Sequence, residues 1–161
     1  MTRPAGRRRL TAGFALAAAG CVVSLVAAPR AARADVTADC DFLEISAKHG
    51  DKPVIDGELK PLEKKLKRPP LSSWNQFKLL SHAQKALAKK KPEPIGLKTG
   101  SATATLVEIV DKSKVRLTVT MNDARGKEVA NNTATVEAGD YLIYGYPLPG
   151  NEGHVLSVSC K

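Results

Sequence analysis

The feature that most constrains the fold is a series of short, strand-like segments that runs from about residue 97 to the end of the chain. In the clearest of them, residues 115–121, every second side chain is apolar, which is the period of a strand with one buried face. The apolar positions of this segment are Val115, Leu117, Val119 and Met121. A chain organised in this way is predicted to build its core from sheets.

Further strands are predicted on both sides of this segment, and the connections between them are short. Turn-forming clusters at 111–114 and 122–127 and a Pro- and Gly-rich loop at 147–153 separate the strands. The other predicted strands are 41–46, 102–110, 129–136, 141–146 and 154–160. The expected fold class is therefore mainly β, a small antiparallel β-sandwich or barrel with one or two short helices in 58–90.

Residues 57–91 contain the expected helices. Pro61 suits the first position of a short helix, and Pro69 ends it. Within this helix Glu63 and Lys67 stand four residues apart and can pair. Its apolar side would consist of Leu59, Leu62 and Leu66.

Residues 74–88 allow two interpretations. Ser73 and Gln76 have the spacing of a capping box, and the apolar residues that follow have roughly helical spacing. The alternative is a strand with Phe77 and Leu79 on its buried face. The local signals favour the helix, but tertiary context often overrides such signals.

The first 34 residues predict export. A basic start ends at Arg9, an apolar run covers 10–28, and Ala32-Arg33-Ala34 has the small-x-small pattern that signal peptidase cleaves. We expect a signal peptide over 1–34, cleavage between Ala34 and Asp35, and a single exported β-rich domain over 35–161. The expected location is the periplasm or the cell exterior, with no transmembrane segment in the mature chain.

Three alternatives remain for this leader. The apolar run is just long enough to span a bilayer as an uncleaved anchor, although its Ala-rich composition and the cleavage site argue against one. Cys21 could carry a lipid, but the apolar run continues past it to Val26. Arg7, Arg8 and Arg9 partly match a twin-arginine signal, so both the general and the twin-arginine routes stay open.

Removal of the leader would leave two of the three cysteines, Cys40 and Cys160. An even pair in an exported domain usually forms a disulfide. A bridge between positions so far apart removes about 4–5 kcal/mol of unfolded-state entropy. A metal or catalytic role is not favoured, because the chain has no C-x-x-C spacing and no third soft ligand near either cysteine.

The net charge of +9 invites a nucleic-acid hypothesis, but the distribution of the charge argues against it. Six arginines of the leader account for six of these charges. The basic character of the remaining chain lies in residues 57–91, which contain ten bases and two acids. No nucleic-acid-reading motif is present, and export removes the protein from the cytoplasm.

The basic segment 60–91 is the first candidate binding surface. Its two clusters can attract anionic lipid, acidic polysaccharide or an envelope protein. The alternative is a solvated surface whose lysine stems cover apolar area. The candidate anion-binding residues are Lys64, Lys65, Lys67, Arg68, Lys89, Lys90 and Lys91.

Three aromatic residues are candidates for stacking on a ligand, namely Trp74, Tyr144 and Tyr146. Trp74 lies between the two basic clusters, and the two tyrosines share a predicted strand face with Leu142. The alternative is packing within the sheet, which the frequency of tyrosine in strands favours.

No motif predicts an enzyme, a cofactor site or a metal site. His49, His82 and His154 have no metal-binding spacing. His49, in a predicted turn, and His154, at the start of a predicted strand, are each expected at the surface. Three acids near the start of the mature domain lack the remaining ligands of a calcium loop and are interpreted as a solvated acidic edge: Asp39, Asp41 and Glu44. A small hydrolase with an unrecognised site is the last-ranked alternative.

Residues 68–80 contain a Pro-Pro-aromatic stretch, Arg68-Pro69-Pro70-Leu71-Ser72-Ser73-Trp74, followed by Phe77-Lys78-Leu79-Leu80. Together with 139–145 and 153–156, they resemble segments of a family of small exported bacterial proteins without an assigned function. The resemblance covers residues 58–160. It implies an extended conformation over 76–88, a following β-meander and no catalytic residues to carry over.

These observations lead to a functional hypothesis. The chain is expected to be a non-enzymatic exported β-domain that acts as a binding or assembly module in the periplasm or cell envelope. Docking to an acidic surface through residues 60–91 is the second hypothesis, and hydrolysis is the third.

Overall fold

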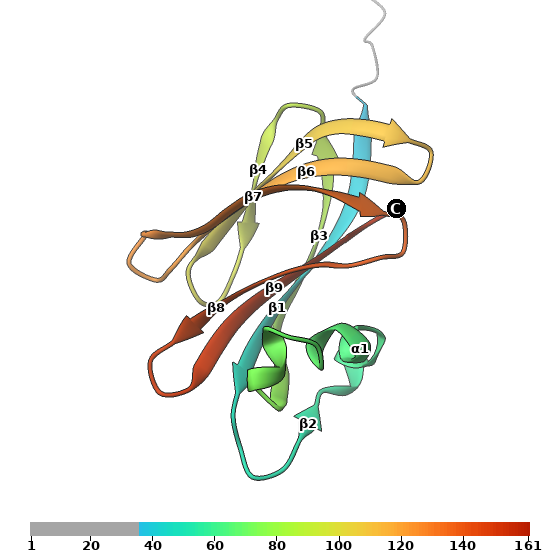
Figure 1. Ribbon diagram of the computed structural model, residues 1–161. Helices are drawn as coiled ribbons and strands as arrows, with labels where there is room; N and C mark the ends of the chain where they lie inside the picture. Colours follow the sequence, from blue (N-terminus) through green and yellow to red (C-terminus); the bar gives the residue numbers. More distant parts are fainter. Residues whose placement is uncertain (1–35) are drawn as a thin grey trace, which may run out of the picture. The chain divides into compact units, whose positions relative to one another are not determined.

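Two β-sheets form the body of the protein (Figure 1). The computed structural model describes residues 36–161, so the predicted signal peptide and its cleavage site at Ala34 and Asp35 lie outside the described residues. Sheet A has five strands in the order β2-β3-β1-β9-β8, and sheet B has four in the order β4-β5-β6-β7. The predicted fold class, a small mainly-β sandwich, is confirmed. The pairing is antiparallel except between β2 and β3.

Sheet B is a meander in which each strand pairs with the next one along the chain. Its strands are β4 (Pro92–Gly96), β5 (Ser101–Asp111), β6 (Lys114–Asn122) and β7 (Glu128–Glu137). The strands predicted at 102–110, 115–121 and 129–136 are confirmed. The sequence did not predict β4, because Pro92 and Pro94 argue against a strand. At a sheet edge such prolines are tolerated, since one side of the strand needs no hydrogen bonds.

Sheet A is assembled from both ends of the described chain. Its strands are β1 (Thr37–Lys48), β2 (Val54–Ile55), β3 (Gln76–Ala88), β8 (Leu142–Leu148) and β9 (Glu152–Cys160). β1 lies between β3 and β9 and pairs with both over most of its length. The strands predicted at 41–46, 141–146 and 154–160 are therefore confirmed, each longer than or offset from its prediction.

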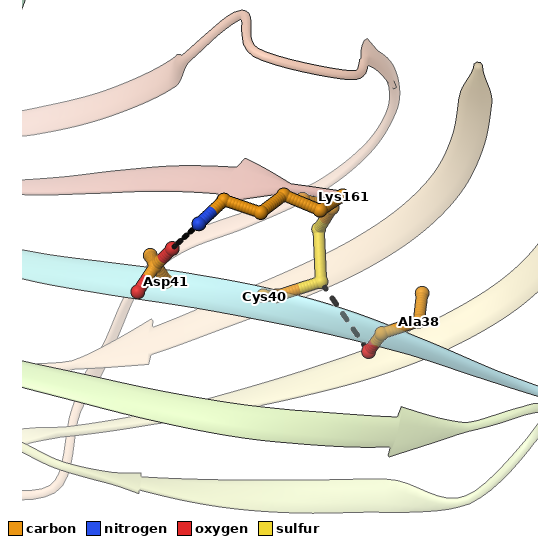
Figure 2. The surroundings of a disulfide bond; sticks show 5 residues. Ala38, Cys40, Asp41 and Lys161 are labelled. Carbon is orange, nitrogen blue, oxygen red and sulfur yellow. Dashed lines mark hydrogen bonds and ion pairs between the residues drawn. A yellow bond between two sulfur atoms is a disulfide. The ribbon is translucent and has the colours of Figure 1, made fainter.

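The predicted disulfide is confirmed. Cys40 on β1 and Cys160 on β9 stand directly opposite each other, with a Cα–Cα distance of 4.1 Å and a sequence separation of 120. Both cysteines are buried, each 2% exposed. Figure 2 shows the bridge beside an ion pair between Lys161 and Asp41 (3.7 Å). The bridge thus joins the central strand of sheet A to its neighbour β9, close to the first and last residues of the described chain.

Sheet A packs against other elements on both faces, but its outer face is covered only near the start of β3. Its inner face packs against sheet B around Phe42, Leu106, Leu117 and Leu156, all at most 1% exposed. Its outer face packs against the segment η1 (Gly57–Leu62), α1 (Glu63–Leu66) and η2 (Leu71–Ser73). The predicted apolar side of that segment is confirmed, since Leu59, Leu62 and Leu66 are each 0% exposed. None of the helices among residues 36–161 has the length and apolar character needed to span a bilayer.

The helical interpretation of residues 74–88 is wrong, and the strand alternative is correct. β3 pairs with β1 from Gln76 to Ala88, and Phe77 is 3% exposed on the face that packs against η1 and α1. The Ser73 hydroxyl donates back to the Pro70 carbonyl (3.1 Å), so it does not cap a following helix. Cross-strand pairing along the whole strand outweighs the local helical spacing.

Candidate functional site

A buried carboxylate with four hydrogen-bond donors lies on the inner face of sheet A. Glu44 of β1 is 0% exposed. It accepts hydrogen bonds from the Ser81 hydroxyl (2.5 Å) and from the backbone amides of Lys98 (2.7 Å) and Thr99 (2.8 Å). His154 of β9 places its Nε2 2.9 Å from the same carboxylate. The network therefore joins β1, β3 and β9 to the loop between β4 and β5.

His154 continues the network to a tyrosine. Its Nδ1 lies 3.0 Å from the hydroxyl of Tyr146, the residue directly opposite it on β8. The two rings meet edge to face, with centroids 5.3 Å apart. The imidazole thus sits between a carboxylate and a hydroxyl, each bonded to a different ring nitrogen. In the tautomer that donates from Nε2 to Glu44, Nδ1 of His154 accepts a hydrogen bond from the Tyr146 hydroxyl.

The electrostatics of the network favour a stable carboxylate. Burial alone would raise the pKa of Glu44, but the hydrogen bonds from Ser81, from the Lys98 and Thr99 amides and from His154 together lower the pKa. The pKa of Tyr146 is raised, first by burial and then by the negative charges of Asp123 and Glu44. Tyr146 therefore keeps its proton and does not serve as a ready nucleophile.

Two predictions about this region are wrong. His154 was expected at the surface and is 1% exposed, and Glu44 was expected on a solvated edge and is 0% exposed. The alternation of the strands contained the signal, because Glu44 continues the inward positions Ala38, Cys40 and Phe42 of β1. Polarity alone had suggested exposure, although a polar residue at an inward position can be buried when donors surround it.

The other histidines lie elsewhere. His82 is exposed and sits 3.1 Å from Asp41, which also accepts from Gln84 (2.7 Å). Asp41 lines an open cavity of about 440 Å³ together with Gln84, Lys85 and Lys161. His49 is exposed, and its Nδ1 is 3.3 Å from the Ser73 carbonyl. Within residues 36–161 no group of three or more His, Cys, Asp or Glu side chains could hold a metal ion.

Trp74 lies in an open cleft next to the C-terminal end of β1. The cleft has a volume of about 510 Å³, and its lining includes four polar side chains: His49, Ser73, Asn151 and Glu152. Pro147 and Leu148 of β8 complete the apolar part of the wall next to Trp74. The cleft therefore combines one half-buried indole ring with polar groups from β9 and from the turns after β1 and β8.

Two glycines and an asparagine hold Trp74 in place. A Cβ on Gly153 would lie 2.3 Å from the indole Cζ2, so only glycine lets the ring reach the sheet there. Gly145 lies on the same face, with the indole Cζ3 3.9 Å from where its Cβ would be. The side chain of Asn75 bonds both the amide (2.8 Å) and the carbonyl (2.6 Å) of Gly50. The indole thus packs on the backbone of the two glycines, and Asn75 ties the chain next to Trp74 to Gly50.

The predicted stacking residues do not form one surface. Trp74 lines the cleft, as a stacking residue would, whereas Tyr144 and Tyr146 are each 8% exposed and pack in the inner core. The stacking role of the two tyrosines is therefore wrong, because neither ring has a face open to a ligand. Their alternative interpretation, packing within the sheet, is correct.

The predicted anion-binding residues are divided between two ends of the domain. Lys64, Lys65, Lys67 and Arg68 belong to or follow α1, beside the start of β3, whereas Lys89, Lys90 and Lys91 follow its end. A strand of 13 residues is about 40 Å long. The segment 60–91 is therefore not one continuous basic surface.

Some of these charges are engaged. Lys65 binds Asp140 and the Tyr141 carbonyl, both at 2.6 Å, and Lys67 binds Glu63 at 2.5 Å. Lys64 and Arg68 are exposed and make no ion pair within the described residues. Ion pairs within the protein thus neutralise some of the charges at the α1 end.

No protein family, no curated protein and no solved structure matches this chain. The resemblance to small exported bacterial proteins accordingly stays a prediction.

Proposed function

We propose that the protein is an exported, non-enzymatic binding module of the cell envelope, and that Trp74 contacts its ligand. The observation that supports this is the Trp74 cleft, an aromatic ring fixed on a rigid sheet and bordered by polar side chains. Binding sites in proteins combine an apolar surface with a few placed polar groups in this way. This is the binding module expected from the sequence, with the Trp74 cleft as its binding surface.

The chemistry of the cleft favours a saccharide. A sugar ring presents an apolar C–H face, which packs on an aromatic ring, and hydroxyl groups, which bond to polar side chains at its edge. His49 and Asn151 offer such groups on the wall of the cleft. Glu152 is held by Lys48 at 2.7 Å and adds a fixed acceptor. The cleft is open, so a ring within a longer glycan chain can also enter it.

The histidines offer less support for the hydrolase hypothesis. The hydroxyl beside His154 belongs to Tyr146, and both residues are buried. His82 pairs with Asp41 at the surface, but its hydrogen-bond partners include no hydroxyl or thiol. A nucleophile next to a base is what such a reaction needs.

Docking to an acidic surface remains the second candidate. It is favoured by Lys64 and Arg68 before the start of β3 and by Lys89 and Lys90 after its end, which are exposed and make no ion pair within residues 36–161. Because the two clusters lie at opposite ends of that strand, either end could dock without the other.

The single tryptophan allows a direct test of the cleft. The exported protein is titrated with neutral and N-acetylated oligosaccharides while the emission of Trp74 is recorded. We expect a saturable change in emission, with His49→Ala weakening affinity several-fold. His82→Ala is the matched control, because His82 is also exposed but lies outside the cleft. Unchanged emission with every saccharide, or equal effects of the two histidine variants, would contradict the proposal.

A further inference from the structure

Exposed apolar side chains gather at one end of the domain. Four large hydrophobic residues are exposed in the described chain, and three of them are Val36 (52%), Ile109 (39%) and Val110 (52%). Val36 precedes β1, while Ile109 and Val110 lie near the end of β5. The fourth, Val54, lies in β2, which pairs with the opposite end of β3.

Several contacts bring these segments together. Thr37 and Ile109 line one cavity of about 280 Å³ with Val115, Val136 and Ala138. The backbone amide of Lys89 donates to the Val36 carbonyl (3.0 Å), and that of Lys90 donates to the Leu106 carbonyl (2.7 Å). The start of β1, the β3–β4 turn and the β5–β6 hairpin therefore share one end of the domain, which is uppermost in Figure 1.

Lysines surround the apolar residues at this end. Lys89, Lys90 and Lys112 are exposed and make no ion pair within residues 36–161. Lys114 and Lys161 also border the cavity, although Lys114 pairs with Glu137 at 2.8 Å and Lys161 with Asp41 at 3.7 Å.

The acids at this end are largely engaged as well. Ser113 donates to the Asp111 carboxylate through its amide (2.8 Å) and its hydroxyl (2.9 Å). Glu108 accepts from Arg116 at 3.1 Å. The hydrogen bonds from Ser113 leave the negative charge of Asp111 in place, so Lys89, Lys90 and Lys112 stand against this one unpaired carboxylate of the hairpin and the balance is positive.

We propose that this end docks on an anionic lipid bilayer. Val36, Ile109 and Val110 would enter the boundary between headgroups and acyl chains, while Lys89, Lys90 and Lys112 would contact lipid phosphates. Exposed apolar side chains next to lysines are the combination that holds proteins at anionic membrane surfaces. The surface is small, so the attachment is reversible and sensitive to salt.

The exposed aliphatic side chains support a lipid partner over a soluble polyanion. A soluble polyanion would explain the lysines but not the three exposed aliphatic side chains. The inference does not depend on the Trp74 cleft, which lies at the opposite end of β1.

The test is flotation of the exported protein with lipid vesicles. The protein is purified from the periplasm of a bacterial host and mixed with vesicles of phosphatidylcholine, either alone or combined with phosphatidylglycerol. We expect flotation only with phosphatidylglycerol, and a several-fold loss when the salt concentration is raised. Flotation that is equal with both lipids, or absent with both, would overturn the proposal.

Three variants locate the surface. The double variant Ile109→Ser with Val110→Ser and the triple variant Lys89→Ser, Lys90→Ser, Lys112→Ser are each expected to reduce flotation several-fold. The matched control removes three charges at the other end through Lys60→Ser, Lys64→Ser and Arg68→Ser, and should float like the unchanged protein. All these side chains are exposed, and thermal unfolding verifies that each variant is folded.

Two outcomes would overturn the lipid proposal in different ways. Equal losses in both triple variants would show that net charge, rather than this end of the domain, governs binding. Binding to a soluble acidic polysaccharide as tight as that to vesicles, and unaffected by the Ile109 and Val110 changes, would assign the lysines to a polyanion. Neither outcome affects the saccharide titration of Trp74, so the two proposals fail independently.

Discussion

The carboxylate of Glu44 is buried away from water, so its stability there depends on the hydrogen-bond donors around it. An unpaired buried charge costs several kcal/mol. Here a hydroxyl, two backbone amides and an imidazole surround the carboxylate, so each lone pair has a donor. The same bonds attach the loop at Lys98 and Thr99 to the sheet. At the residue scale, the network therefore stabilises the junction of the two sheets.

Replacing Glu44 by Ala is expected to lower the free energy of unfolding by about 3 kcal/mol. The substitution leaves the Lys98 and Thr99 amides and His154 without an acceptor in a buried place. Urea denaturation measures the change. Asp39→Ala is the matched control, because Asp39 lies on the same strand but is exposed, and its effect should stay within about 0.5 kcal/mol. Equal losses in the two variants would contradict a structural role for the network.

The same carboxylate predicts a dependence of stability on pH. Hydrogen bonding lowers the pKa of folded Glu44 below its ordinary value of 4.5, despite burial. As the pH falls, the unfolded chain therefore takes up this proton first. The stability contributed by the carboxylate is complete above the unfolded pKa and is lost as the pH falls through the folded pKa. Urea midpoints measured from neutral pH downward should fall less steeply in Glu44→Gln than in the unchanged protein. Parallel curves would assign the acid sensitivity to other groups.

At the scale of elements, the strands that could be predicted are those whose pattern is local. Val115, Leu117, Val119 and Met121 alternate strictly, and β6 pairs with neighbours that directly precede and follow it. β3 was harder, because its partner β1 lies more than 25 residues earlier and the local spacing after Trp74 resembles a helix. β4 was missed for a related reason: its prolines are tolerated only because it lies at an edge.

The docking of Trp74 on the hairpin of β8 and β9 gives a prediction at this scale. Gly153→Ala places a methyl group against the indole, so the ring must move away from the sheet. We expect a loss of about 2 kcal/mol in stability and a shift of Trp74 emission towards longer wavelength as the ring becomes more exposed. Gly57→Ala is the control, because a Cβ there meets nothing within 4 Å. Unchanged emission in Gly153→Ala would show that the sheet does not position the ring.

At the scale of the whole molecule, the sequence could predict that the ends are joined but not how the surfaces are arranged. The pairing of Cys40 with Cys160 was predicted from the expected export and from the number of cysteines, and it implied that the first and last strands are neighbours. The order of sheet A depends on contacts between distant segments, so no local pattern encodes it. For the same reason the lysines of 60–91 were expected to act together, although the length of β3 separates them. The sequence could not predict the candidate cleft either, because Trp74 and Asn151 are close only in the folded chain.

The disulfide should therefore act on the stability of the entire domain. It closes a loop with a sequence separation of 120, and cross-linking such a loop removes unfolded-state entropy worth about 5 kcal/mol. The double variant Cys40→Ala with Cys160→Ala is expected to unfold at a lower urea concentration. The corresponding loss in the free energy of unfolding should be most of these ~5 kcal/mol, about 4 kcal/mol. Because both cysteines are buried, reductant alone should leave the native bridge intact, whereas reductant with urea should open it. Intact mass of the exported protein, measured with and without reduction, checks the bridge directly and also reports cleavage after Ala34. Two free thiols in the exported protein, or an unchanged urea midpoint in the double variant, would show that the contacts of β1 with β3 and β9 hold the domain without the bridge.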